Sequence, residues 1–226
     1  MTEPVGRNGS EKVRRKNPEQ TRRKLMGATV ASLFERGYGG LSTVDVAKRA
    51  RVSRGGQLHH FPRKQELLAE TVAHLFDRRL AELRANISKL PAAPPEHRLA
   101  AFIDAIWPAF RSRTFYAWLE LVVASRTDSR LRQANAMLIE RFRGSGAQLI
   151  SAALGPEVAH LALDFGALAA LVLGSMEAMA LNSVAAGTSL KASRQMLPRL
   201  QSLKTASGLF LKHMIEAAQN SAAPSP

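Results

Sequence analysis

Apolar residues recur along the chain at intervals of three and four positions, with polar residues between them. This spacing places apolar side chains on one face of an α-helix. A clear example is the set Leu99, Phe102, Ile103, Ile106, Trp107 and Phe110. The two-residue alternation that is typical of half-buried strands does not occur. The sequence therefore predicts an all-α protein.

Capping residues and helix breakers divide this pattern into separate helices. Asn17 followed by Pro18 predicts the start of a first helix, which ends at Gly37. A long helix is expected to begin near Lys64 and to stop before the KLPAAPP segment, residues 89–95. Later helices are predicted over residues 99–110 with a kink at Pro108, 115–125, 131–154, 157–186 and about 190–218.

The stretch from residue 42 to residue 64, STVDVAKRARVSRGGQLHHFPRK, predicts two short helices joined by a tight turn. Ser42 and Ser53 are suitable N-caps for the two helices. Such a pair places its second helix in the major groove of DNA. Gly55 and Gly56 add almost no side-chain bulk, so the backbone of that helix can approach a phosphate or a base edge closely.

Charge supports a polyanionic partner for the N-terminal part of the chain. The net charge is +14, and residues 1–90 hold 19 of the 32 basic and 9 of the 18 acidic side chains. Residues 1–16 form a basic, polar arm that is expected to be mainly a solvated tail, although such arms can enter a minor groove.

No secretory or membrane segment is expected. The first 30 residues lack an apolar core, and the most apolar run, 165–176, is shorter than the roughly 20 residues needed to span a bilayer. The absence of cysteine excludes disulfides and thiolate metal sites. We therefore expect a cytoplasmic protein without a membrane partner.

Three segments, TRRKLMGATVASLFERGY, STVDVAKRARVS and RGGQLHHFPRKQELL, make residues 21–76 resemble the DNA-binding domain of the TetR family. Arg51 stands where the family usually has a glycine with positive φ, and Val44 where an arginine is common. The resemblance implies an N-terminal three-helix helix-turn-helix domain, residues 17–78, and a C-terminal helical ligand-binding and dimerisation domain, residues 79–220. Residues 221–226 are expected to form a tail. The implied function is a regulator that a small-molecule effector releases from a double-stranded DNA operator.

The residues expected to contact DNA lie on or beside the two short helices. They are Thr43, Val44, Arg54, Gly55, Gly56, Gln57, His59, His60 and Lys64. Arg54 suits guanine and Gln57 suits adenine, whereas Thr43, His59 and Lys64 are expected at phosphates. Residue chemistry places Leu58 inward and Gln57 outward, while the family register implies the reverse.

A ligand pocket is expected in the C-terminal domain, where large apolar residues lie on separate helices and two glutamates interrupt apolar runs. The candidates are Trp107, Phe110, Trp118, Glu120, Met137, Phe142, Met176, Glu177 and Met179. Aromatic walls with one or two carboxylates would suit a hydrophobic cation. Alternatively, these residues are ordinary core, and either glutamate pairs with an arginine such as Arg126 or Arg141.

The last two predicted helices are expected to form a homodimer. The sets that indicate this are the small residues Gly166, Ala170 and Gly174, and the seam Met196, Leu200, Leu203, Ser207, Phe210 and Met214. The alternative is that both faces are packed within one chain.

No catalytic or metal site is predicted. Glu157 and His160 form a single Glu-x-x-His motif, whereas helical di-iron sites need two, and the adjacent His59 and His60 point apart on a helix. We therefore expect no enzyme, cofactor or metal. Two further functions remain open, which are a non-specific DNA-packaging protein and an all-helical carrier of small molecules.

Overall fold

The computed structural model describes residues 17–185 and 190–222, and within these ranges it contains helices and turns but no strand. The all-α prediction is confirmed. The predicted arm, residues 1–16, and all but the first two residues of the predicted tail lie outside the described ranges. The helices are α1 (Pro18–Arg36), α2 (Thr43–Arg49), α3 (Arg54–His60), α4 (Lys64–Ile87), α5 (Pro95–Ile106), η1 (Trp107–Arg111), α6 (Arg113–Ala124), α7 (Ser129–Leu154), η2 (Pro156–Val158), α8 (Phe165–Ala185) and α9 (Leu190–Ala222).

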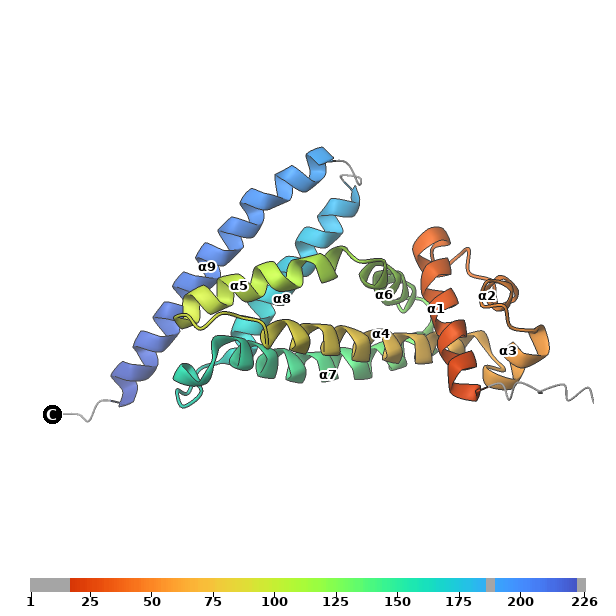
Figure 1. Ribbon diagram of the computed structural model, residues 1–226, viewed down its shortest axis with the longest axis horizontal. Coiled ribbons are helices and arrows are strands. Elements are labelled where there is room, and N and C mark those ends of the chain that lie inside the picture. Colours follow the sequence, from red (N-terminus) through yellow and green to blue (C-terminus); the bar gives the residue numbers. More distant parts are fainter. Residues whose placement is uncertain (1–16, 186–189, 223–226) are drawn as a thin grey trace, which may run out of the picture.

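Helices α1, α2 and α3 form a group at one end of the elongated molecule, and α8 and α9 lie toward the other end (Figure 1). Helix α4 runs from the first group along α7 through the middle of the molecule. Helix α8 packs on α7 and α9, α5 packs on α9, and α6 packs on α1. Both α4 and α6 therefore connect the small N-terminal group with the larger bundle.

Two hydrophobic cores are joined through α4. Its first half contributes Leu67, Leu68, Val72 and Leu75 to the core beneath α1–α3, and its second half contributes Phe76, Leu80 and Leu83 to the core of the bundle. The domain division drawn from the sequence after residue 78 falls inside this helix. Because one continuous helix serves both cores, a displacement of α4 in the bundle must also affect the helices that pack on its other half.

Two helix boundaries show how local chemistry sets the fold. Helix α5 ends at Ile106 and continues as the 3₁₀ helix η1, because Pro108 cannot donate the α-helical hydrogen bond. This agrees with the predicted kink. Helix α8 begins at Phe165, eight residues later than predicted, because the Asp164 carboxylate caps it by accepting the Ala167 N–H at 2.9 Å.

The apolar stretch of helix α8 is longer than the predicted run of residues 165–176. It continues past Glu177, and by length and composition Phe165–Val184, with a mean hydropathy of 1.5, could cross a membrane. In this fold, 39% of the window is buried, in packing against α7 and α9. Its exposed apolar side chains include Leu171, Leu181 and Val184.

The seam predicted on α9 is mostly packed within the chain. Met196, Leu200, Leu203 and Ser207 are buried, so these residues are not available to a second subunit. Phe210 is 38% exposed, and α9 also exposes two residues outside the predicted seam, Leu197 and Leu209. The apolar surface that remains uncovered therefore combines these α9 residues with the exposed residues of α8.

The turn between α2 and α3 carries backbone strain. Arg51 has φ +54°, and it is the one described residue other than glycine with a positive φ. The left-handed region costs a side-chain-bearing residue about 1–2 kcal/mol, because Cβ crowds the following carbonyl. Its own amide donates to the Lys48 carbonyl at 3.1 Å, and the Val52 amide donates to the Ala47 carbonyl at 3.0 Å.

Replacing Arg51 by glycine is expected to stabilise the protein by about 0.5–1 kcal/mol, since relief of this strain exceeds the extra entropy of glycine in the unfolded chain. The measurement is urea unfolding followed by helical circular dichroism at fixed protein concentration. Arg51→Ala is the matched control, because it removes the same charge but keeps the Cβ. Equal midpoint shifts in the two variants would show that charge, not backbone strain, dominates.

Candidate DNA-reading face and ligand pocket

Side-chain caps fix the start of each of the two short helices. Ser42 Oγ accepts the Asp45 N–H at 3.5 Å at the start of α2, and Ser53 Oγ accepts the Gly56 N–H at 3.1 Å at the start of α3. Both predicted N-caps are therefore confirmed. Val46 and Ala47 of α2 are buried, which leaves the opposite sides of α2 and α3 facing outward.

The outward face of α3 carries Arg54, Gly55, Leu58 and His59, all exposed. Val44 of α2, 56% exposed, continues the same surface. The guanidinium of Arg54 donates through Nη1 to Thr43 Oγ1 at 3.0 Å, so one side chain links the two helices. These residues share one accessible surface, which we name the reading face, and their contacts with DNA remain predictions.

The position of Gln57 shows that the register of α3 suggested by residue chemistry is wrong. Its side chain is buried, its Nε2 donates to the Phe61 carbonyl at 2.7 Å, and its Oε1 accepts from Arg54 Nη1. A buried amide is tolerated here because both of its ends are hydrogen-bonded. Leu58, by contrast, is 41% exposed. The observed register is the one that the family resemblance implied, and Gln57 orients Arg54 instead of facing a base.

The two glycines of α3 have different surroundings. A Cβ on Gly56 would lie 3.1 Å from Ser53 Oγ and from Val52 Cγ1, so the turn itself leaves little space there. A Cβ on Gly55 would meet nothing within 4 Å. Among the described residues, no neighbour requires glycine at position 55, so the backbone there is open to the approach of an external surface.

His60 and Lys64 are more closely involved in the fold than the sequence suggested. Burial lowers the pKa of His60, and the positive charges of His59 and Arg22 lower it further. Lys64 Nζ donates to the Leu41 carbonyl at 3.0 Å and lies 4.7 Å from the centre of the Tyr38 ring. An ammonium has three donors, so a phosphate contact by Lys64 would use the remaining ones.

Glu120 also lies elsewhere than predicted. Its carboxylate does not line the pocket but accepts the backbone N–H of Tyr38 at 2.9 Å. The Tyr38 hydroxyl in turn donates to Asp128 at 3.0 Å. The pKa of Asp128 is lowered because the Leu131 N–H, the Tyr38 hydroxyl and the Arg130 N–H all donate to it. We call Tyr38, Glu120 and Asp128 the junction, since they tie the loop after α1 to α6 and α7.

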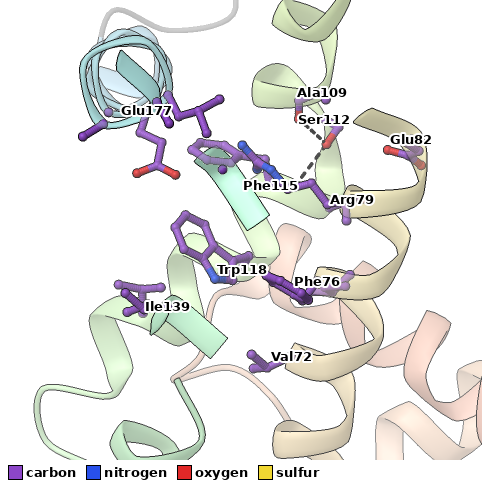
Figure 2. A pocket seen from close by; sticks show the side chains of 18 of the residues that line it. Val72, Phe76, Arg79, Glu82, Ala109, Ser112, Phe115, Trp118, Ile139 and Glu177 are labelled. Carbon is purple, nitrogen blue, oxygen red and sulfur yellow. Dashed lines mark hydrogen bonds between the residues drawn. The ribbon is translucent and has the colours of Figure 1, made fainter. Parts of the chain in front are cut away.

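A cavity of about 640 Å³ opens between α4, η1, α6, α7 and α8 (Figure 2). Trp118 and Glu177 are the two members of the predicted set that line it. Aromatic and aliphatic side chains make up most of the wall, among them Phe76, Phe115, Trp118 and Ile139. Gly166, Ala170 and Gly174 of α8 also line it, so their small size leaves open space instead of close helix packing.

The other predicted pocket residues whose side chains are described do not line this cavity. Trp107, Phe110, Met176 and Met179 are buried in the core of the bundle, where large apolar side chains most often lie. Met137 points outward and is 72% exposed. The side chain of Phe142 is outside the described residues. Among those that are described, no group of three or more His, Cys, Asp or Glu could hold a metal ion.

Arg79 is the pocket residue that sequence reasoning missed. Its Cζ lies 4.1 Å from the ring centre of Phe110, 5.1 Å from that of Phe115 and 6.0 Å from that of Trp118. Burial lowers its pKa to about 10, while Glu177 and Glu82 oppose that shift. The available signal was position, because Arg79 falls on the apolar stripe of α4, between Phe76 and Leu83.

Comparisons with known proteins agree with this arrangement. Residues 25–71 match the family model "Bacterial regulatory proteins, tetR family". The chain is 36% identical over 124 residues to the HTH-type transcriptional regulator CymR of Pseudomonas putida. The match covers 55% of this chain and 60% of CymR, so the chain spans less than two thirds of the length of that relative.

Solved structures resemble the whole fold. A transcriptional regulator from Pseudomonas aeruginosa PAO1 matches 87% of this chain and 95% of its own, with a TM-score of 0.66 and 23% identity. A transcriptional regulator from Saccharomonospora viridis in complex with choline matches 86% and 97%, with a TM-score of 0.57 and 18% identity. At these identities the likeness concerns the fold alone.

Gly55→Ala is expected to have opposite effects on stability and on DNA binding. Alanine should stabilise α3 by about 0.5–1 kcal/mol. The added methyl group should also weaken DNA binding by tenfold or more, if the backbone approaches DNA here. Unfolding curves and fluorescence anisotropy with labelled duplex measure the two quantities separately. Gly27→Ala is the matched control, because Gly27 is equally open but lies in α1. Unchanged DNA affinity in Gly55→Ala would remove Gly55 from the DNA contact.

Proposed function

Residues 25–71 match the TetR family of transcriptional regulators, and from this premise we propose that the chain is a member of that family and a dimeric, sequence-specific repressor released by a small apolar or amphipathic molecule. The observation that carries the proposal is the reading face, where the exposed Arg54 and Gly55 lie beside the half-buried Thr43, which accepts a hydrogen bond from Arg54. Arginine on such a helix pairs with two acceptors of guanine, and an open glycine lets the backbone approach the groove.

Dimerisation is supported by the uncovered apolar surface of α8 and α9. Its members, between 37% and 64% exposed, are Leu171, Leu181, Val184, Leu197, Leu209 and Phe210. Exposed apolar groups of this number on two neighbouring helices are typical of a protein interface. A two-fold arrangement would present two reading faces to half-sites about 34–36 Å apart.

Release by a ligand is supported by the position of the cavity. Helices α4 and α6 supply part of its wall and also pack on α1, so they connect the cavity with helices α1–α3. A ligand that binds better to one spacing of the two reading faces would shift the population toward that spacing. The neighbour that was crystallised with choline shows that a protein of this fold can hold a small organic molecule.

The partners follow from the same function. We propose that the chain binds operator DNA, a small effector and a second copy of itself. Because genomic DNA is one of these partners, we propose that the protein is cytoplasmic. The relative matched here is a transcriptional regulator, and we propose no enzymatic activity. No resident cofactor or metal is part of the proposal.

The test begins by selecting an operator from a random duplex library with the purified full chain. Binding to that operator is then titrated against a scrambled duplex at several salt concentrations. The operator should bind at least about 10³-fold more tightly than the scrambled duplex. Arg54→Ala should lose about tenfold to a hundredfold for the operator alone, since it removes a base contact. Arg84→Ala, which removes an exposed charge near the far end of α4, should change neither affinity.

Two results would replace the proposal. Equal affinity for operator and scrambled duplex, with a steep salt dependence, would indicate a DNA-packaging protein. Absence of binding to either duplex at about 0.1 M salt would indicate a carrier of small molecules, with the cavity as its main site.

A further inference from the structure

Charge in the cavity is limited to three side chains among its described lining residues, which are Arg79, Glu82 and Glu177. Glu82 is 45% exposed and pairs with Arg78, whose Nε lies 2.9 Å from its Oε1. Figure 2 shows Arg79 extending from α4 toward Phe115 and the side where Glu177 enters, with Glu82 apart from both. Among the described lining residues, the interior of the cavity therefore contains one cation, Arg79, and one carboxyl, Glu177.

Arg79 is held in an orientation that suits a carboxylate. Its guanidinium lies over the rings of Phe110 and Phe115, at 4.1 Å and 5.1 Å from their centres, and its Nε and Nη2 are buried. The two rings lie beside the guanidinium carbon, while the N–H groups of a guanidinium lie in its plane, the geometry for a bidentate carboxylate bond. With its pKa at about 10, the group stays charged at neutral pH.

Glu177 also favours a negatively charged ligand. Burial raises the pKa of its carboxyl, and the positive charge of Arg79 opposes that shift. Of the two interior groups, the carboxyl is therefore the one that more readily becomes neutral. A neutral carboxyl can donate its O–H to an anion. A bound cation, in contrast, would lie near the permanent charge of Arg79 in an environment of low dielectric constant, which is costly.

We propose that the cavity binds an aromatic monocarboxylate, with its carboxylate paired to Arg79 and its rings against Trp118, Ile139 and Val72. The ligand class rests on the proposed function, in which this cavity is the effector site. Its volume of about 640 Å³ lies within the range of small-molecule sites and leaves room for fused rings. The apolar wall supplies affinity, and the cation selects the acid.

The experiment is calorimetry on the full chain without DNA, using three probes with the same ring system. They are 2-naphthoate, the neutral 2-naphthamide and the cation 2-naphthylmethylammonium. The acid should bind about tenfold to a hundredfold more tightly than the amide, the usual size of a charged hydrogen bond in binding. The ammonium should bind most weakly. This order in the wild type tests the proposal without any substitution.

Variants then locate the selectivity. Arg79→Met removes the charge and leaves an unbranched apolar side chain in its place. This variant should bring the ratio of acid to amide affinity close to one. Arg79→Lys should give an intermediate ratio, because it keeps the charge but loses the planar donors. Arg78→Met is the matched control, since Arg78 is exposed on the same helix and should leave the ratio unchanged.

A pH series tests the role of Glu177. A bound carboxylate raises the pKa of Glu177 further, so binding takes up a proton there. Affinity for 2-naphthoate should therefore rise as the pH falls from about 8 to about 6, while the naphthoate itself stays ionised. The amide should show no such trend, and Glu177→Gln should remove it.

Several results would overturn the proposal. They are tightest binding of the ammonium with loss in Glu177→Gln, equal binding of acid and amide, acid preference that persists in Arg79→Met, and binding of none of the three probes. Failure of the proposed function would look different. If naphthoate binding depended on Arg79 but left operator affinity unchanged, ligand-driven release from DNA would be disproved. The assignment of aromatic monocarboxylates to the cavity would still hold.

Discussion

The continuous helix α4 is the constraint on which the rest of the structure depends. Its 24 residues span about 36 Å at a rise of about 1.5 Å per residue, and no break separates the half beneath α1–α3 from the half in the bundle. Val72 and Leu75 pack in the first core and also line the cavity. Arg79, one to two turns further on, stands in the cavity wall. Because packed cores resist continuous deformation, we propose that a change in the cavity is transmitted as a shift of this helix.

The junction provides a second connection. Trp118 lines the cavity, and Glu120, two residues later on α6, accepts the Tyr38 N–H directly after α1. Gly37 is required at this point, since its φ is +68° and a Cβ would lie 3.0 Å from the Glu120 carboxylate. The two connections meet at α1, which packs on both α4 and α6. A ligand that displaces Trp118 or Arg79 therefore acts on the same small group of helices.

The sequence predicted features that depend on neighbours along the chain, and it missed those that depend on distant partners. The caps at Asn17, Ser42 and Ser53 are local signals, and each is confirmed. Gln57 is a local exception, because its amide is satisfied by the nearby Phe61 carbonyl and Arg54, whereas polarity alone predicts an outward position. The partner of Glu120 is 82 residues away, which no local pattern reveals. Phe110 and Met176 lie in the core of the bundle, because a large apolar side chain fits a core as well as a cavity wall and size alone does not separate the two.

The central claim is that the cavity and the reading face are coupled. Thermodynamic linkage requires such coupling to be reciprocal. The direct measurement is the Kd of 2-naphthoate for the free protein and for the protein saturated with its selected operator. We predict weaker naphthoate binding to the operator complex, by the same factor by which saturating naphthoate weakens operator binding. Equal Kd values for the free and the operator-bound protein would contradict the claim.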